Sequence, residues 1–240
     1  MKGPIRERKE ERIFTTRASV SLAVLNTIIN NIEDIIEEYN LNINDLSLRW
    51  GSVDSILNPS ENIYIKIYYK YNLNINKNID IDNININISI NEGYGDMGFL
   101  MLYDLVEKII LQDAFEYAIK ASYTTRTGIE FIFYYLDDGR IAMFEGEYHR
   151  VRLPKVRAVA SIHTHPEGAC GLSKQDIESG LDLLAEGGLL LGAATTSCMA
   201  VMRRRFMVSE EDYLKIKEYL LNKKINFKKL DTVVFNVIRY

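Results

Sequence analysis

The stretch His163-Thr164-His165-Pro166, followed after six residues by Ser173-Lys174-Gln175-Asp176, decides how this chain is interpreted. Side chains alternate across a strand, so the two histidines of an extended segment would project from the same face. The proline ends that segment, because it has no backbone N–H with which to continue a strand ladder. The run 156–162 before it predicts a buried strand. We therefore expect the histidines at a strand end.

Asp176 completes a candidate metal site with these histidines. Ser173 and Asp176 fit a helix capping box, with the serine as N-cap and the aspartate at the third helical position. That position directs the carboxylate back toward the strand end. Either pattern alone is more often structural, but the two together favour a site. His163, His165 and Asp176 are the ligand types that a catalytic zinc uses when its fourth position is kept for water.

This pattern resembles the JAMM (MPN+) motif of zinc isopeptidases. That family includes the proteasome-lid deubiquitinase and archaeal enzymes that remove ubiquitin-like modifiers. The loop of small residues around Cys170, between the histidines and Ser173, is also similar to the family's loop. The resemblance implies an α/β protein whose C-terminal part has the MPN (JAB/MPN+) fold, with a mixed sheet flanked by helices.

The resemblance also implies a glutamate on an earlier strand that follows the first helix of the domain. Glu130 fits this place, because it directly follows an amphipathic helix expected over about 102–121. Glu145 and Glu147 are the alternatives. They come after the turn at 137–139, which assigns them to the next strand. We therefore favour Glu130 as the general base.

In the chemistry that follows from the resemblance, zinc lowers the pKa of a water toward about 7. Glu130 accepts the proton of this water, and Ser173 donates a hydrogen bond to the tetrahedral oxyanion. Cys170 is not a nucleophile in this mechanism. The expected function is that of a zinc-dependent isopeptidase, a metalloprotease that hydrolyses the bond between a ubiquitin-like modifier and its target.

Three other functions remain open within the same resemblance. One is a metal hydrolase of the JAB fold that processes a sulfur-carrier tail. Another is a non-catalytic MPN scaffold subunit, against which the intact metal set argues. The third is a nucleic-acid-associated protein of the DNA-repair-linked branch. Because Gly187-Gly188 passes straight into an apolar run, we expect no insertion of the kind that the long-chain ubiquitin enzymes carry, which favours a simpler modifier tail.

Composition excludes several classes of protein. Hydrophobic residues make up 47% of the 240 residues, enough for a sizeable core in one large or two small domains. A net charge of −4 gives no support for general nucleic-acid binding. No apolar run approaches the length of a membrane span, and the first eight residues lack the apolar core of a signal peptide. We expect a cytoplasmic protein without a membrane partner.

The two cysteines, Cys170 and Cys198, do not suffice for a disulfide framework. In the expected fold, Cys198 lies on a strand beside the metal strand. We therefore predict that the Cα atoms of the two cysteines lie within about 7 Å, the outer limit for a bridge. A disulfide would close a loop containing Asp176. Two buried thiols are the alternative, and they are the usual state in a reducing cytosol.

We predict that the chain has two parts. Residues 1–98 form an N-terminal α+β region with a helix and a β-hairpin, and residues 99–240 form a JAMM/MPN+ metalloprotease domain. The expected elements are a helix at 22–39, strands at 63–68 and 79–90, a hinge at 92–98, a buried strand region at 189–202, a helix at 210–222 capped by Ser209, and a strand at 232–238.

Basic residues gather in two places, Arg203-Arg204-Arg205 and the group Arg150, Arg152, Lys155 and Arg157. They could hold an acidic partner, but a solvated face is the favoured interpretation. His149 is expected to be an ordinary surface histidine.

Overall fold

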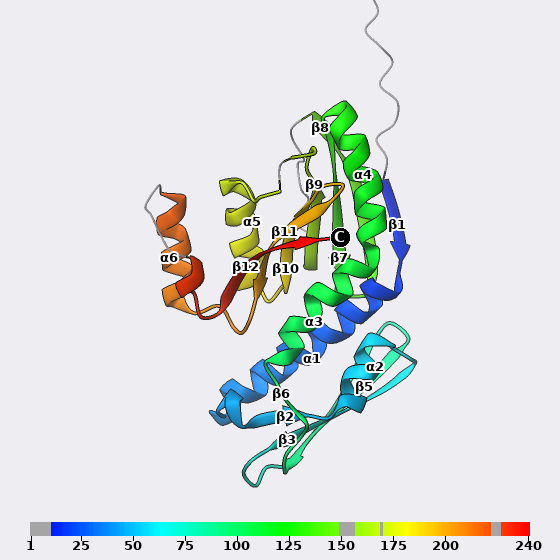
Figure 1. Cartoon of the computed structure of the whole chain (residues 1–240). Helices are drawn as coiled ribbons and strands as arrows, with labels where there is room; N and C mark the ends of the chain where they lie inside the picture. The colour runs from blue at the N-terminus through cyan, green and yellow to red at the C-terminus, as the bar shows by residue number, and fades with distance from the viewer. Residues whose placement is uncertain (1–10, 149–156, 169, 222–226) are drawn as a thin grey trace, which may run out of the picture.

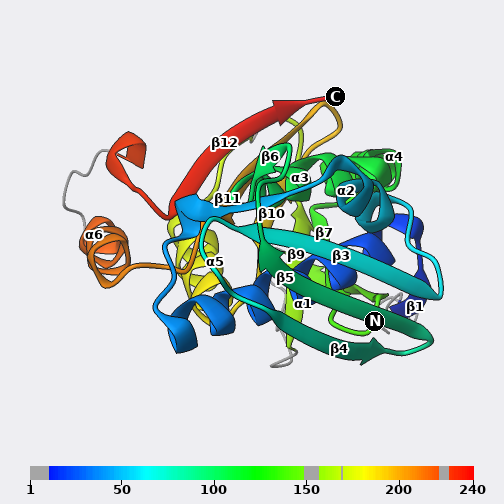
Figure 2. The same cartoon turned by 90° about the horizontal axis from the view of Figure 1, so that it is seen from below.

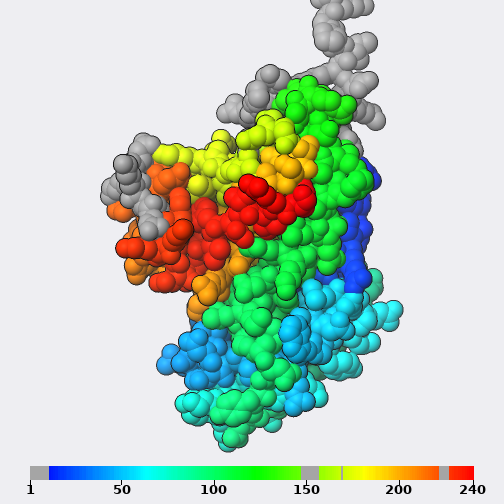
Figure 3. Space-filling view, in the orientation of Figure 1, coloured from blue at the N-terminus to red at the C-terminus, as the bar shows by residue number. Residues whose placement is uncertain are grey.

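A computed structural model describes residues 11–148, 157–168, 170–221 and 227–240. Within these residues the chain is a mixed α/β structure with two mixed sheets flanked by helices, which confirms the predicted fold class at this level (Figure 1). The elements of the seven-stranded sheet make up the upper part of the molecule in Figure 3, and those of the five-stranded sheet make up the lower part.

The seven-stranded sheet carries the predicted metal strand near its centre. Its strands, in sheet order, are β1 (Glu11–Thr15), β8 (Arg140–Tyr148), β7 (Ile129–Leu136), β9 (Ala158–Thr164), β10 (Leu190–Ala194), β11 (Cys198–Arg204) and β12 (Val233–Arg239). Strands β9 and β10 are parallel, and the other neighbouring pairs are antiparallel. A parallel pair needs a crossover connection, and helix α5 (Lys174–Ala185) supplies it.

Helices cover both faces of this sheet. Helices α1 (Arg17–Tyr39), α3 (Met101–Ile110) and α4 (Ala114–Thr127) pack with Phe131 and Phe133 in the main core. Helices α5 and α6 (Glu210–Leu220) share a second apolar cluster on the opposite face, and Leu183 of α5 packs near Ile132. Because neighbouring residues of β7 alternate between the faces, Phe131 faces α4 and Ile132 faces α5.

The five-stranded sheet packs against the same main core from the other side. Its strands, in sheet order, are β4 (Ile75–Ile81), β5 (Ile84–Glu92), β3 (Asn62–Tyr69), β2 (Leu46–Leu48) and β6 (Met97–Gly98), with α2 (Trp50–Leu57) beside them. Its alternating isoleucines are buried in the main core, and the polar residues between them face outward, as the period of two predicts. The view in Figure 2 shows this sheet in front of α1.

Helix α1 connects the two sheets. A capping box between Thr16 and Ser19 begins it, and Asn40 ends it in a left-handed conformation. Strand β1 precedes α1 and pairs with β8. The chain therefore contributes one strand to the seven-stranded sheet before it forms the five-stranded sheet. The division of the chain into domains 1–98 and 99–240 stays a prediction. The main core includes side chains from both of these segments.

Two expectations for the middle of the chain were wrong. The continuous helix over 102–121 is interrupted by a 3-10 turn at Leu111–Asp113, where the Asp113 carboxylate accepts hydrogen bonds from Thr16 Oγ1 (2.9 Å) and Tyr135 Oη (2.8 Å). The segment 92–98 is not a free hinge, because Met97 and Gly98 pair with β2. A Cβ at Gly95 would lie 2.3 Å from the carbonyl oxygen of Leu48.

Two predicted strand regions are each a hairpin. The isoleucine-rich run at 79–90 belongs to β4 and β5, which a turn at Asp82 separates, and β3 pairs in parallel with β5. The region 189–202 contains β10 and β11, because 195–197 forms the connection between two antiparallel strands. Cys198 therefore lies on β11, which is separated from β9 by β10, and not beside the metal strand as expected.

The basic run is not a solvated face. Arg203 and Arg204 are buried on β11, where they pair with carboxylates of α3 and α1 respectively. The sequence could not show this, because each partner lies far away along the chain. His149, Arg150, Arg152 and Lys155 lie outside the described residues.

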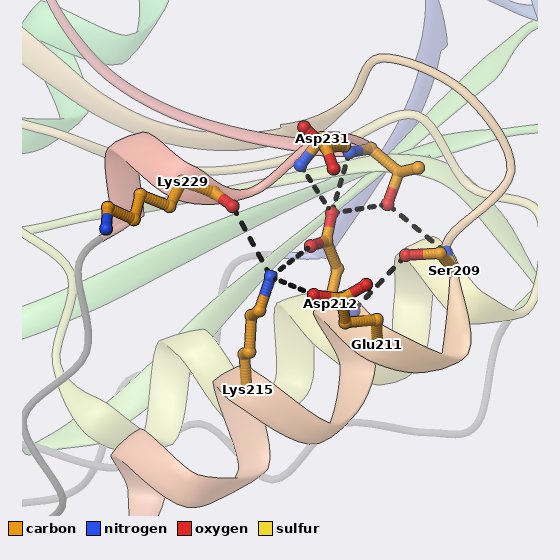
Figure 4. A network of polar contacts seen from close by, with 7 residues as sticks. Ser209, Glu211, Asp212, Lys215, Lys229 and Asp231 are labelled. Atoms are coloured by element: carbon orange, nitrogen blue, oxygen red, sulfur yellow. Dashed lines mark hydrogen bonds and ion pairs between the residues drawn. The ribbon is translucent and has the colours of Figure 1, made fainter.

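Helix α6 is fixed by its first turn (Figure 4). Ser209 accepts a hydrogen bond from the backbone N–H of Asp212, which confirms the predicted N-cap. The buried Asp212 carboxylate accepts hydrogen bonds from the backbone of Asp231 (2.8 Å) and from the backbone and hydroxyl of Thr232 (both 2.7 Å). These contacts hold α6 against the chain that leads into β12.

Candidate metal centre

The side chains of His163, His165 and Asp176 converge on one point. The two Nε2 atoms are 2.9 Å apart, and the Asp176 oxygens lie 3.2 Å from Nε2 of His163 and 3.6 Å from Nε2 of His165. Ligand atoms bound tetrahedrally to one zinc ion are about 3.3 Å apart, as zinc–ligand bonds of about 2.0–2.1 Å require. In the described part of the chain, this is the one group of three His, Cys, Asp or Glu side chains close enough to hold a metal ion.

Strand pairing on both sides fixes the position of His163. Its Cα pairs with Ile132 of β7 and with Ala193 of β10. The next residue, Thr164, is fully buried, and its hydroxyl accepts a hydrogen bond from the backbone N–H of Phe131 (2.9 Å). This central strand is a rigid base for the first ligand.

His165 lies just beyond the end of β9, as the proline after it predicts. Its backbone N–H donates to the carbonyl of Ala194 (2.8 Å). The imidazole is 15% exposed, compared with 11% for that of His163. Both imidazoles are therefore largely buried but still reach solvent, so a small group could approach the fourth position of a bound metal.

The predicted capping box at the start of α5 is confirmed. Ser173 Oγ accepts a hydrogen bond from the backbone N–H of Asp176 (3.2 Å), and the Ser173 N–H donates to Asp176 Oδ2 (2.7 Å). The capping box thus aims the carboxylate at the histidines. Burial acts to raise the pKa of Asp176, but hydrogen bonding and charge from His163, followed by hydrogen bonds from Ser173, lower it to about 2. The carboxylate is ionised at neutral pH, as a metal ligand must be.

Glu130 lies on the strand next to β9. It is two residues from Ile132, whose Cα pairs with His163, so strand alternation places Glu130 on the face that carries the histidines. Its side chain is half-buried. The register between β7 and β8 shifts next to Glu130, between Ile129 and Phe131.

Glu145 and Glu147 lie on β8, which is separated from β9 by β7. Glu145 pairs with Phe131, and residues directly opposite in an antiparallel pair share a face. Because Phe131 faces α4, the alternation of side chains places Glu145 on the face away from the histidines. The strand arrangement therefore favours Glu130 over Glu145 as a group near the candidate metal.

The hydroxyl of Ser173 has a second capacity in this position. As an N-cap its oxygen accepts a hydrogen bond, which leaves its hydrogen for another acceptor. Ser173 is exposed and lies at the same end of α5 as Asp176. An oxyanion formed beside the three ligands could therefore accept this hydrogen.

Cys170 and Cys198 form a disulfide with a Cα–Cα distance of 6.2 Å, which confirms the predicted proximity. The alternative of two thiols is wrong for this structure. The reason for the proximity differs from the expectation, because the loop after His165 reaches across β10 to the start of β11. The bridge encloses Ser173 and Asp176 in its loop.

One residue near the site was missed by sequence reasoning. Glu167 follows the histidine motif, and its carboxylate accepts hydrogen bonds from the hydroxyls of Thr196 and Ser197. The sequence analysis placed the Thr-Thr-Ser run at 195–197 within the buried strand region expected over 189–202. No local pattern connects this turn with a glutamate about thirty residues earlier, so only the fold reveals the contact.

No protein-family model matches this chain, and neither a curated protein nor a solved structure matches it. In the described residues, no helix combines the length and the apolar character that a membrane crossing requires. The site itself therefore carries the functional argument.

Proposed function

We propose that this protein is a zinc-dependent isopeptidase that hydrolyses the bond between a ubiquitin-like modifier and its target. The observation that carries the proposal is the convergence of His163, His165 and Asp176 at the spacing of a zinc ligand set. The position of Glu130 on the same face supports it, because a hydrolase of this kind needs a base next to the metal.

Each residue has a defined task in the reaction. A zinc ion held by His163, His165 and Asp176 would supply Lewis acidity for the scissile carbonyl and for a water, whose pKa it would lower toward about 7. Glu130 accepts the proton of the attacking water and later gives a proton to the leaving amine. Ser173 donates its hydroxyl hydrogen to the oxyanion, a contact whose removal typically costs about 2.7–4 kcal/mol. No covalent intermediate with the protein is needed.

The order of elements supports the MPN (JAB/MPN+) fold for residues 99–240. Helix α4 is followed by the glutamate strand β7, by β8, by the metal strand β9 and by α5. Helix α5 ends at Ala185, and β10 begins at Leu190. The short connection leaves no room for the insertion of long-chain ubiquitin enzymes, so a simpler modifier tail is the favoured substrate.

An exposed apolar stripe on α4 supports a protein substrate. Phe115, Ile119 and Tyr123 recur every four residues and are 79%, 47% and 38% exposed. The same helix ends at the site, because Thr125 Oγ1 accepts a hydrogen bond from the backbone N–H of Glu167 (2.9 Å). A folded modifier could dock on this stripe while its tail enters the metal centre.

The test combines metal analysis with a panel of conjugates. Protein prepared without chelator and supplied with zinc at neutral pH should contain one zinc per chain. It should cleave a modifier–lysine conjugate and lose this activity with a chelator. Absence of bound zinc would refute the proposal and favour a scaffold subunit. Zinc binding with release of an amino acid from a sulfur-carrier tail, but with no isopeptide cleavage, would favour the other hydrolase. Salt-dependent DNA binding would favour the nucleic-acid-associated branch.

A further inference from the structure

Glu167 joins three segments around the candidate metal centre. Its backbone N–H donates to Thr125 Oγ1 at the end of α4 (2.9 Å). One carboxylate oxygen accepts a hydrogen bond from Ser197 Oγ (3.2 Å), and the other accepts one from Thr196 Oγ1. The loop that begins at His165 is thus tied both to α4 and to the connection between β10 and β11.

This tie bears on His165 more than on the other two ligands. His163 lies within β9 between two paired strands, and the capping box of α5 holds Asp176. His165 follows the last residue of β9, so the loop continues directly from this ligand. Holding the loop therefore helps to keep the imidazole in its orientation.

The connection at 195–197 is firm enough to hold the loop. The backbone N–H of Cys198 donates to Thr195 Oγ1 (3.1 Å), and Thr195 is fully buried. The Tyr240 hydroxyl donates to the carbonyl of Thr195 (2.7 Å). The two hydroxyls that reach Glu167 therefore project from a fixed turn and not from a loose one.

We infer that Glu167 is a positioning residue for the metal centre, which holds the loop after His165 through the hydroxyls of Thr196 and Ser197 so that this imidazole stays in place for zinc. The inference rests on the proposed function. Loss of groups that orient a metal ligand typically weakens metal binding by about 10–100-fold. Because Glu167 acts through the loop and the disulfide at Cys170 also holds it, the effect should lie near tenfold.

The experiment measures zinc affinity by competition with a chromogenic chelator. Glu167→Ala should weaken zinc binding by about tenfold. Glu167→Gln should remain within about threefold of the wild type, because an amide can accept from one hydroxyl and donate to the other. Glu61→Ala removes an exposed glutamate in front of β3 and should leave zinc binding unchanged. Circular dichroism checks that each variant is folded.

A double variant tests the route of the effect. Thr196→Val with Ser197→Ala removes both hydroxyls while Glu167 stays, and it should weaken zinc binding about as much as Glu167→Ala. Adding Glu167→Ala to it should then cause little further loss. If the wild type binds zinc and Glu167→Ala binds it with the same affinity, this inference alone is overturned. A wild type that binds no zinc would overturn the proposed function as well.

Discussion

Glu130 and Glu145 lie on neighbouring strands, and strand pairing assigns them to opposite faces of the sheet. A single position decides whether a carboxylate can reach the metal centre, because side chains alternate along a strand. In the sequence, the order of a helix followed by a strand favoured Glu130 through the family resemblance, and the strand register supplies an independent geometric reason.

Glu130→Gln should therefore keep zinc but lose turnover by about 10²–10⁴-fold, because an amide cannot accept the proton of water. Conjugate cleavage and zinc content measured on the same preparation check this. Glu145→Gln is the matched control and should cleave at nearly the wild-type rate. If Glu145→Gln is the inactive variant and Glu130→Gln is not, the assignment of the base is wrong.

At the scale of elements, the disulfide connects the loop after β9 with the start of β11. It joins two positions that are 28 residues apart in the sequence, and the loop it closes contains α5 and two residues of the site. Restricting such a loop in the unfolded chain stabilises the folded protein by roughly 3–4 kcal/mol. The bridge therefore stabilises the element that carries Asp176.

Replacing both cysteines by serine should lower the free energy of unfolding of the zinc-free protein by about 3–4 kcal/mol. Urea denaturation of the variant and the wild type measures this. A reducing agent should destabilise the wild type by a similar amount and leave the double variant unaffected. Equal stability of the oxidised and reduced wild type would contradict the expectation.

The apolar stripe of α4 belongs to the same scale. Phe115→Ala should raise the KM for a folded modifier conjugate by about tenfold, since a buried aromatic anchor at an interface contributes more than about 1 kcal/mol. The kcat for a short peptide substrate should not change, because Phe115 lies near the start of α4, ten residues before Thr125, which contacts the loop of the site. Leu214→Ala, on the exposed surface of α6, is the control. Equal KM values for Phe115→Ala and the wild type would exclude this docking surface.

At the scale of the molecule, a buried ion pair connects α1 with β11. Arg204 donates to Glu33 (2.9 Å), to Asn30 (2.8 Å) and to the carbonyl of Gly187 (3.1 Å), and Tyr103 Oη donates to the same glutamate (2.5 Å). Helix α1 also packs against the five-stranded sheet, so this pair helps to hold the two sheets in one body.

Glu33→Ala should cost about 3–5 kcal/mol of stability, because it leaves Arg204 as an uncompensated buried charge. Thermal and chemical unfolding measure the loss. Glu37→Ala, which changes an exposed glutamate one turn later on α1, should change stability by no more than about 0.5 kcal/mol. A loss below about 1 kcal/mol in Glu33→Ala would show that the pair is not important for holding the helix.

The sequence by itself determined the local features of this protein. The strand before the histidines, the caps of α5 and α6, and the alternating strands of the five-stranded sheet all follow from neighbours a few residues apart. The strand end that carries the two histidines and the capping box that carries Asp176 are among these local features.

Only the tertiary structure decided the strand order, the interruption at Leu111, the burial of Arg204 and the contact between Glu167 and its two hydroxyls. Each of these depends on residues that are distant along the chain, such as Arg204 and Glu33 with a separation of 171 positions. A basic run looks the same in a sequence whether water or carboxylates surround it. Its environment is set when α1 packs against β11, since burial and pairing arise only from that contact.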